Sequence, residues 1–137
     1  MLRKNQNVKG VIVDVRGNPG GLLDQAVGVA NIWLEKDTVI LEEKRGGETK
    51  ETFTAKVEPV LKGVKTVVLI DEGSASASEI VAGALQDNGA ATLMGKKSFG
   101  KGSVQQVIEL SNGGSLKVTI ARWYTPKGKN IDKEGIA

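Results

Sequence analysis

The sequence has 137 residues, enough for one domain with a hydrophobic core. Its 19 Lys and Arg residues against 16 Asp and Glu give a net charge of +3 that is spread along the chain, so a nucleic-acid-binding surface is not indicated. Cysteine and histidine are both absent, which excludes disulfides, thiol nucleophiles, their metal sites and a Ser-His-Asp triad. Any general base must therefore be a lysine, a carboxylate or a tyrosine.

Apolar, β-branched runs alternate with glycine-rich turns and predict an α/β domain. In chain order, we expect a strand over 8–15, a helix over 22–35, a hairpin from 38–44 and 50–55, a strand over 65–70, a helix over 76–88, a strand over 91–94 and a hairpin from 104–110 and 115–124. The apolar positions of 22–35 cover most of a helix, which indicates that this helix is well buried. Residues 130–137 have too little pattern to assign. We expect a mixed sheet, partly parallel, with antiparallel hairpins.

The serines that follow the strand over 65–70 stand where a nucleophile would sit, in a tight turn that opens a helix. Ser76 and Glu79 also fit the S-x-x-E capping box, and the local sequence alone favours Ser76 as a helix cap. A catalytic role needs a base within hydrogen-bond reach, because a free serine hydroxyl is a poor nucleophile.

The glycine-rich loop 95–102 supplies a candidate base, Lys101. The helix over 76–88 runs roughly 20 Å away from its start and the next strand returns roughly 17 Å, so this loop comes back near Ser76. A lysine acts as a base only when it is neutral, and an ordinary exposed loop lysine is the competing interpretation. The sequence of this loop is also close to the P-loop motif. However, Gly102 stands where the motif requires Ser or Thr, and a strand follows where the motif requires a helix, so we expect no nucleotide to bind.

The turn Arg16–Gly21 is a second place where backbone amides are exposed. Glycines between a strand and a helix leave N–H groups that hold an anion or an oxyanion. A plain tight turn that needs glycine explains the same pattern.

Three ordered motifs closely resemble those of the carboxyl-terminal processing proteases, also called tail-specific proteases. They are VDVRGNPGG at 13–21, GSASASEIVAGALQD at 73–87 and SFGKGSVQ at 98–105, and the resemblance spans about 8–137. It implies a fold similar to the spiral ββα core of the ClpP and crotonase proteins. It disfavours a third class, an acyl-CoA-binding enzyme of the crotonase type.

The resemblance implies a serine endopeptidase with a Ser-Lys dyad that cuts protein substrates near their C-terminus, without metal or cofactor. It assigns Ser76 as nucleophile, Lys101 as general base, Gln105 as the residue that orients the lysine, and Asp87 as a weaker candidate. The oxyanion hole would use the amide of Ala77 and one from Gly20 or Gly21.

Members of this family are exported to the periplasm or cell envelope and capture the substrate tail with a PDZ domain. The 137 residues have no room for a PDZ domain and no apolar signal or membrane-spanning segment. We therefore expect a soluble single domain over 1–137, the protease core of a longer chain. A catalytically inactive interaction or scaffold domain of the same fold is the alternative.

Overall fold

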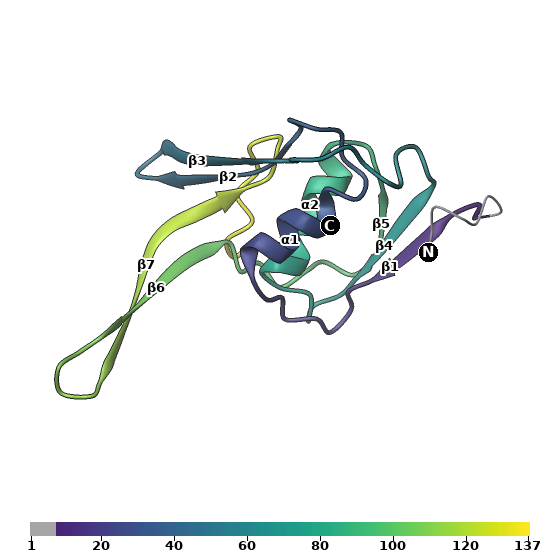
Figure 1. Ribbon diagram of the computed structural model, residues 1–137. Helices are drawn as coiled ribbons and strands as arrows, with labels where there is room; N and C mark the ends of the chain where they lie inside the picture. Colours follow the sequence, from purple (N-terminus) through teal and green to yellow (C-terminus); the bar gives the residue numbers. More distant parts are fainter. Residues whose placement is uncertain (1–7) are drawn as a thin grey trace.

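A computed structural model describes residues 8–137, which form an α/β fold of two sheets and two helices (Figure 1). The strands are β1 (Val11–Asp14), β2 (Val39–Arg45), β3 (Glu48–Thr54), β4 (Thr66–Ile70), β5 (Thr92–Gly95), β6 (Ser103–Glu109) and β7 (Ser115–Tyr124), and the helices are α1 (Leu23–Ala30) and α2 (Ala77–Asp87). Every predicted element is present in the predicted order, which confirms the mixed α/β class.

The first sheet is parallel, with strand order β1-β4-β5. Val13 lies opposite Val68, and Val68 lies opposite Leu93 in the next pair. Parallel neighbours require crossover connections, which α1 with the β2–β3 hairpin and α2 provide. Because the strands run in one direction, the turns that follow β1 and β4 emerge at the same edge of the sheet.

The second sheet is antiparallel, with strand order β3-β2-β7-β6, and joins the two hairpins through β2 and β7. We expected parallel and antiparallel strands in one mixed sheet, whereas the structure places them in two sheets. Strand β3, with the sequence ETKETFT, is mostly exposed and forms one edge of the antiparallel sheet.

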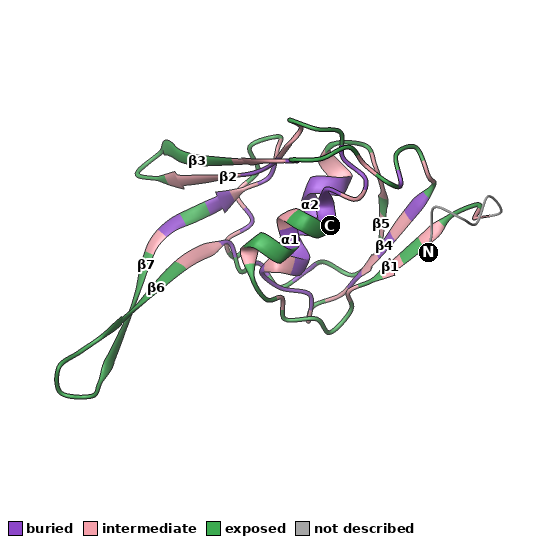
Figure 2. Cartoon of the chain, in the orientation of Figure 1, coloured by how far each residue is buried: buried purple, intermediate pink, exposed green. Residues whose placement is uncertain are grey.

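Helix α2 forms the centre of the core and lies, with α1, between the two sheets (Figure 1). Every residue from Ser78 to Leu85 is buried (Figure 2). Gly83 lets the helix approach the C-terminal segment closely, since a Cβ there would lie 2.9 Å from Ile136 Cδ1. None of the helices among residues 8–137 is long and apolar enough to cross a membrane.

Helix α1 is shorter and more exposed than the sequence suggested. It ends at Ala30, and its C-cap Asn31 uses both ends of its side chain to hold the following chain, with Nδ2 donating to Val57 O at 2.7 Å and Oδ1 accepting from Lys56 N at 2.7 Å. Within α1 only Ala26 and Ala30 are buried and Val29 is 38% exposed, so the expectation of a helix buried on most sides was wrong.

The unassigned residues 130–137 belong to the folded core. Ile131 and Ile136 are 2% and 1% exposed. Backbone bonds tie this segment to the glycine-rich loop, from Ser98 N to Ile136 O (2.9 Å) and from Lys133 N to Gly100 O (2.7 Å). Two isoleucines and one alanine among these eight residues give no periodicity, so sequence patterns could not detect this packing.

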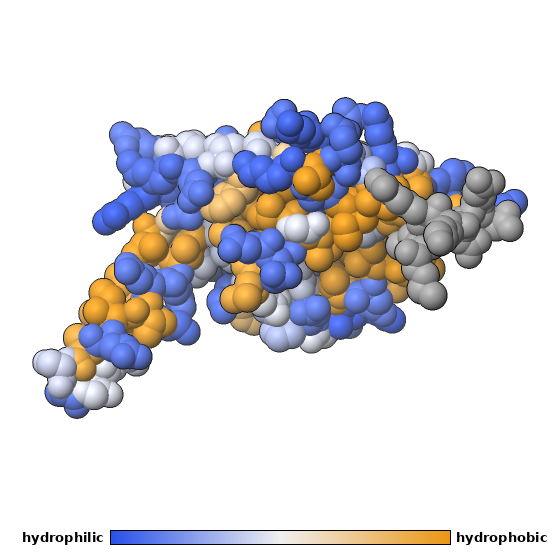
Figure 3. Space-filling view, viewed as in Figure 1, coloured by the Kyte–Doolittle hydropathy of each residue, from blue (hydrophilic) through white to orange (hydrophobic). Residues whose placement is uncertain are grey.

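Strands β6 and β7 extend as an arm beyond the body of the molecule (Figure 1). The arm carries exposed apolar side chains (Figure 3), including Ile108 and Leu116, which lie opposite one another in register. These residues leave an apolar face without cover from residues 8–137.

Candidate active site

Ser76 occupies a strained position between β4 and α2. Its φ of 56° and ψ of −117° are uncommon for a residue with a Cβ, and such conformations persist only where surrounding contacts enforce them. The residue is 9% exposed. Apart from its capping contact with the N–H of Glu79, the Ser76 hydroxyl has no hydrogen-bond partner among residues 8–137.

The predicted capping box is present and involves a buried carboxylate. The N–H of Ser76 donates to Glu79 Oε2 at 2.9 Å, and the N–H of Glu79 faces the Ser76 side chain while it donates to the Ser76 carbonyl at 2.9 Å. The capping box therefore forms at Ser76, which is almost entirely buried.

The glycine-rich turn after β1 lies directly against Ser76. Asn18 O accepts from Ala75 N at 3.0 Å and from Ser78 Oγ at 3.1 Å. Gly20 has a φ of 95°, and a Cβ there would lie 2.8 Å from the Cβ of Ser76. Only glycine permits this approach.

Two backbone amides at this junction have no acceptor among residues 8–137, those of Ala77 and Gly21. The amide of Gly20 is already used, because it donates to Asn18 Oδ1 at 2.9 Å. Of the two glycines predicted for the oxyanion hole, Gly20 and Gly21, only Gly21 therefore has an amide without an acceptor among residues 8–137. Ala77 is the first residue of α2, where unpaired N–H groups and the helix dipole favour a negative charge.

Asp71 joins the two turns to each other. Its Oδ1 accepts from Gly17 N at 2.8 Å and from Gly73 N at 2.9 Å. The bond from Gly17 is the main reason that the pKa of Asp71 is lowered, and the bonds from Gly73 and Ser74 act in the same direction. The carboxylate therefore stabilises the approach of the glycine turn to the serine turn.

A second carboxylate orders the start of the glycine turn. Asp14 accepts from Arg16 Nε at 3.0 Å and from its terminal nitrogen at 2.8 Å. This side-chain pair lowers the pKa of Asp14 to about 2. Both side chains are largely exposed.

The loop that carries Lys101 reaches the same junction through its backbone. Gly100 N donates to Glu79 Oε1 at 2.6 Å, and Lys101 N donates to Glu79 Oε2 at 2.9 Å. Because Ser76 N uses the same Oε2, the amide nitrogens of Ser76 and Lys101 lie within about 6 Å of each other. The Lys101 side chain is exposed and makes no hydrogen bond to Ser76 Oγ.

The contacts of two predicted site residues, Gln105 and Asp87, do not place them next to Ser76. Gln105 is exposed on β6, and its side chain makes no hydrogen bond to residues 8–137. Asp87 is the last residue of α2, at the opposite end from Ser76, and its carboxylate accepts from Lys127 N at 2.9 Å.

Sequence reasoning missed three contributors to this site. Glu79 was interpreted only as a cap, Asn18 received no role, and residues 131–136 were left unassigned. Only Glu79 had a detectable signal, its place in the capping box, and nothing in that motif indicates that the carboxylate also binds the Lys101 loop.

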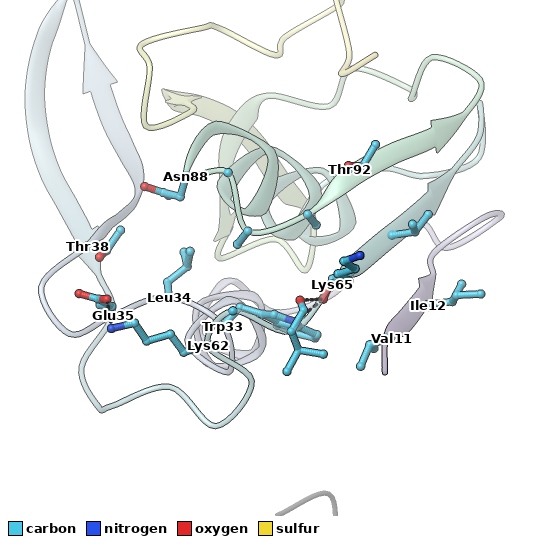
Figure 4. A pocket seen from close by; sticks show the side chains of 18 residues that line it. Val11, Ile12, Trp33, Leu34, Glu35, Thr38, Lys62, Lys65, Asn88 and Thr92 are labelled. Carbon is cyan, nitrogen blue, oxygen red and sulfur yellow. Dashed lines mark hydrogen bonds and ion pairs between the residues drawn. The ribbon is translucent and has the colours of Figure 1, made fainter. Parts of the chain in front are cut away.

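A separate hollow of about 1100 Å³ lies at the amino ends of the parallel strands. Figure 4 shows Val11, Trp33 and Leu34 on its wall, with Lys62 and Glu35 paired at one side. No residue of the candidate active site lines it.

Comparisons with protein families and solved structures identify proteins that this chain resembles. Residues 1–137 match the sequence model of peptidase family S41, so the chain belongs to this family. The solved structure of a photosystem II D1 C-terminal processing protease superposes with a TM-score of 0.91 at 35% identity, and covers 98% of this chain and 34% of that one.

Curated relatives are also similar. A carboxyl-terminal-processing protease of Synechocystis is 47% identical over 97% of this chain and 31% of its own length. The carboxy-terminal processing protease CtpA of Bacillus subtilis is 40% identical over 97% of this chain and 28% of its own length. The chain thus spans less than a third of these relatives.

The approach of Gly20 to Ser76 gives a first prediction. Gly20→Ala should destabilise the protein by at least about 2 kcal/mol more than Gly47→Ala, because an added Cβ would lie 2.6 Å from Ala75 O. Gly47 has a similar φ of 86° with open space around it, so this control isolates the steric clash. Urea unfolding measures both, and equal losses would contradict the described contact.

The clamp at Asp71 gives a prediction of pH dependence. Its lowered pKa means that its contribution to stability is complete above about pH 4, the value of an unfolded aspartate, and is lost as pH falls through the folded value. The parent should therefore be more stable than Asp71→Asn at pH 7, and this difference should shrink below about pH 4. Urea midpoints measure it, with the exposed Glu109→Gln as control. A difference independent of pH would refute the clamp.

Proposed function

We propose that this chain is the catalytic core of a serine endopeptidase that hydrolyses polypeptides near their C-terminus. Family membership and the names of the similar proteases support the reaction class. The chain spans less than a third of the curated relatives, so the tail-directed activity is proposed for the longer polypeptide that contains it.

The shared carboxylate of Glu79 is the observation that best supports a Ser-Lys dyad. It binds the backbone of Ser76 and of Lys101 at one oxygen, although the two residues are 25 positions apart. The four-carbon stem of a lysine spans the remaining distance to the serine hydroxyl. No other lysine shares a hydrogen-bond acceptor with Ser76 among the described residues.

In the proposed mechanism, neutral Lys101 takes the proton of Ser76 and the serine oxygen attacks a peptide carbonyl. The amides of Ala77 and Gly21 donate to the oxyanion that forms. Lys101 then protonates the leaving amine, and the acyl-enzyme is hydrolysed by water. Gln105 orients the lysine once substrate is bound, and Asp87 remains a weaker candidate for a supporting role.

In the proposed dyad, the Lys101 side chain, which makes no hydrogen bond to Ser76 Oγ, turns towards the serine when substrate binds. Hydrogen bonds between catalytic groups are often long in unliganded enzymes and shorten in the complex. We propose that a bound polypeptide covers Lys101, removes it from water and thereby favours the neutral amine.

The parent polypeptide would supply what this core lacks. We propose a PDZ domain that captures the substrate tail, and export to the periplasm or cell envelope. One relative, from Arabidopsis, is named as a chloroplastic carboxyl-terminal-processing peptidase.

Substitution of the dyad tests the proposed reaction. In the full-length native polypeptide, Ser76→Ala and Lys101→Ala should each lower kcat on a natively disordered protein by at least about a thousandfold. Lys97→Ala, a neighbouring exposed lysine of the same loop, should leave kcat unchanged. Quantified cleavage of β-casein on gels measures all three.

Retained cleavage in Ser76→Ala would overturn the assigned nucleophile, and retained cleavage in Lys101→Ala would overturn the assigned base. If the parent polypeptide itself cleaves nothing, the chain is an interaction domain of the same fold.

A further inference from the structure

We propose that Glu79 is a positioning residue that holds the Lys101 loop in register with the Ser76 turn. This inference rests on the proposed Ser-Lys reaction. It assigns to Glu79 a role that goes beyond capping α2.

The carboxylate of Glu79 is buried and fully engaged. It is 1% exposed. Its Oε1 accepts from Ser98 Oγ at 2.6 Å and from Gly100 N at 2.6 Å, and its Oε2 accepts from Ser76 N and Lys101 N at 2.9 Å each. Three of these four bonds go to residues 98–101, about twenty positions further along the chain.

Capping alone does not account for this arrangement. In a capping box the glutamate side chain accepts one bond, from the N-cap amide, and the serine side chain accepts the reciprocal bond from the glutamate amide. Here the glutamate is buried and binds the loop that carries the proposed base. The described residues offer it no lysine or arginine as an ion-pair partner, so hydrogen bonds and the N-terminus of α2 stabilise its charge.

The two carboxylate oxygens of Glu79 bind different groups, and together they fix the position of the Lys101 loop relative to Ser76. Oε2 sets the distance between the backbones of Ser76 and Lys101. Oε1 fixes the loop through Ser98 and Gly100. An amide in place of the carboxylate would present an NH₂ group to two donors, so at least one buried N–H would lose its acceptor.

The C-terminal segment braces the same loop from the other side. Ser98 Oγ donates to Glu79 and accepts from Ile136 N at 2.7 Å. Gly100 is packed so closely that a Cβ there would lie 2.9 Å from Gly135 N. The loop is therefore held between α2 and residues 131–136. Glu79 joins it to the serine turn, together with the bond from Phe99 N to Ser74 O at 2.9 Å.

Glu79→Gln in the full-length native polypeptide tests this role. Because a displacement of about 1 Å can cost on the order of a hundredfold in rate, we expect kcat on β-casein to fall by about that factor while KM stays within about twofold. Labelling of Ser76 by a fluorophosphonate, measured on the folded fraction, should slow in parallel. Glu72→Gln, an exposed glutamate in the preceding turn, should change neither quantity.

A folded Glu79→Gln protein with lower unfolding temperature but the parent's kcat would overturn the proposal and leave Glu79 as a cap. If this variant does not fold, Ser98→Ala replaces it, because it removes one donor to Oε1 and leaves the other three. Its kcat should fall roughly tenfold at unchanged KM, and an unchanged kcat would likewise overturn the proposal.

The outcomes separate this inference from the proposed function. Loss of cleavage in Ser76→Ala and Lys101→Ala, with full kcat in Glu79→Gln, contradicts only the positioning role. Retained cleavage in the dyad variants contradicts the reaction itself.

Discussion

The buried carboxylate of Glu79 is the interaction on which the candidate site depends. Two of its four hydrogen bonds come from the backbone amides of Ser76 and Lys101, the residues proposed to react. The other two come from Ser98 and Gly100, in the loop that carries Lys101. A buried charge is tolerated only when its hydrogen-bonding capacity is satisfied, so the same bonds that stabilise the carboxylate also determine where Ser76 and Lys101 lie. Stability and geometry at this site therefore have one physical cause.

The parallel sheet places the other half of the site. Strands β1 and β4 end at one edge, and the turns that follow them meet because Gly20 has no side chain and Asp71 accepts N–H groups from both. This contact is so close that a Cβ on Gly20 would lie 2.7 Å from the amide nitrogen of Ala77. The chain superposes on the solved structure of a processing protease with a TM-score of 0.91.

The sequence predicted the elements and their order because apolar runs and glycine turns are local signals. It also placed Lys101 near Ser76, from helix and strand lengths alone. It did not predict two separate sheets, the exposed face of α1 or the packing of residues 131–136, because each depends on long-range contacts that leave no local pattern. Glu79 is the clearest example. Its capping-box motif predicts one hydrogen bond to its side chain, and the fold adds three more from residues 98–101. The roles of Ser76, Lys101, Gln105 and Asp87 stay predictions.

The central claim is that Lys101 reaches Ser76 when the site is occupied. The most direct test is a crystal structure of the full-length native polypeptide with a peptide-like phosphonate bonded to Ser76. The account predicts Lys101 Nζ about 3 Å from Ser76 Oγ, with Glu79 Oε2 still bound to both amides. A Lys101 side chain in solvent, with another group of the polypeptide against Ser76 Oγ, would contradict it.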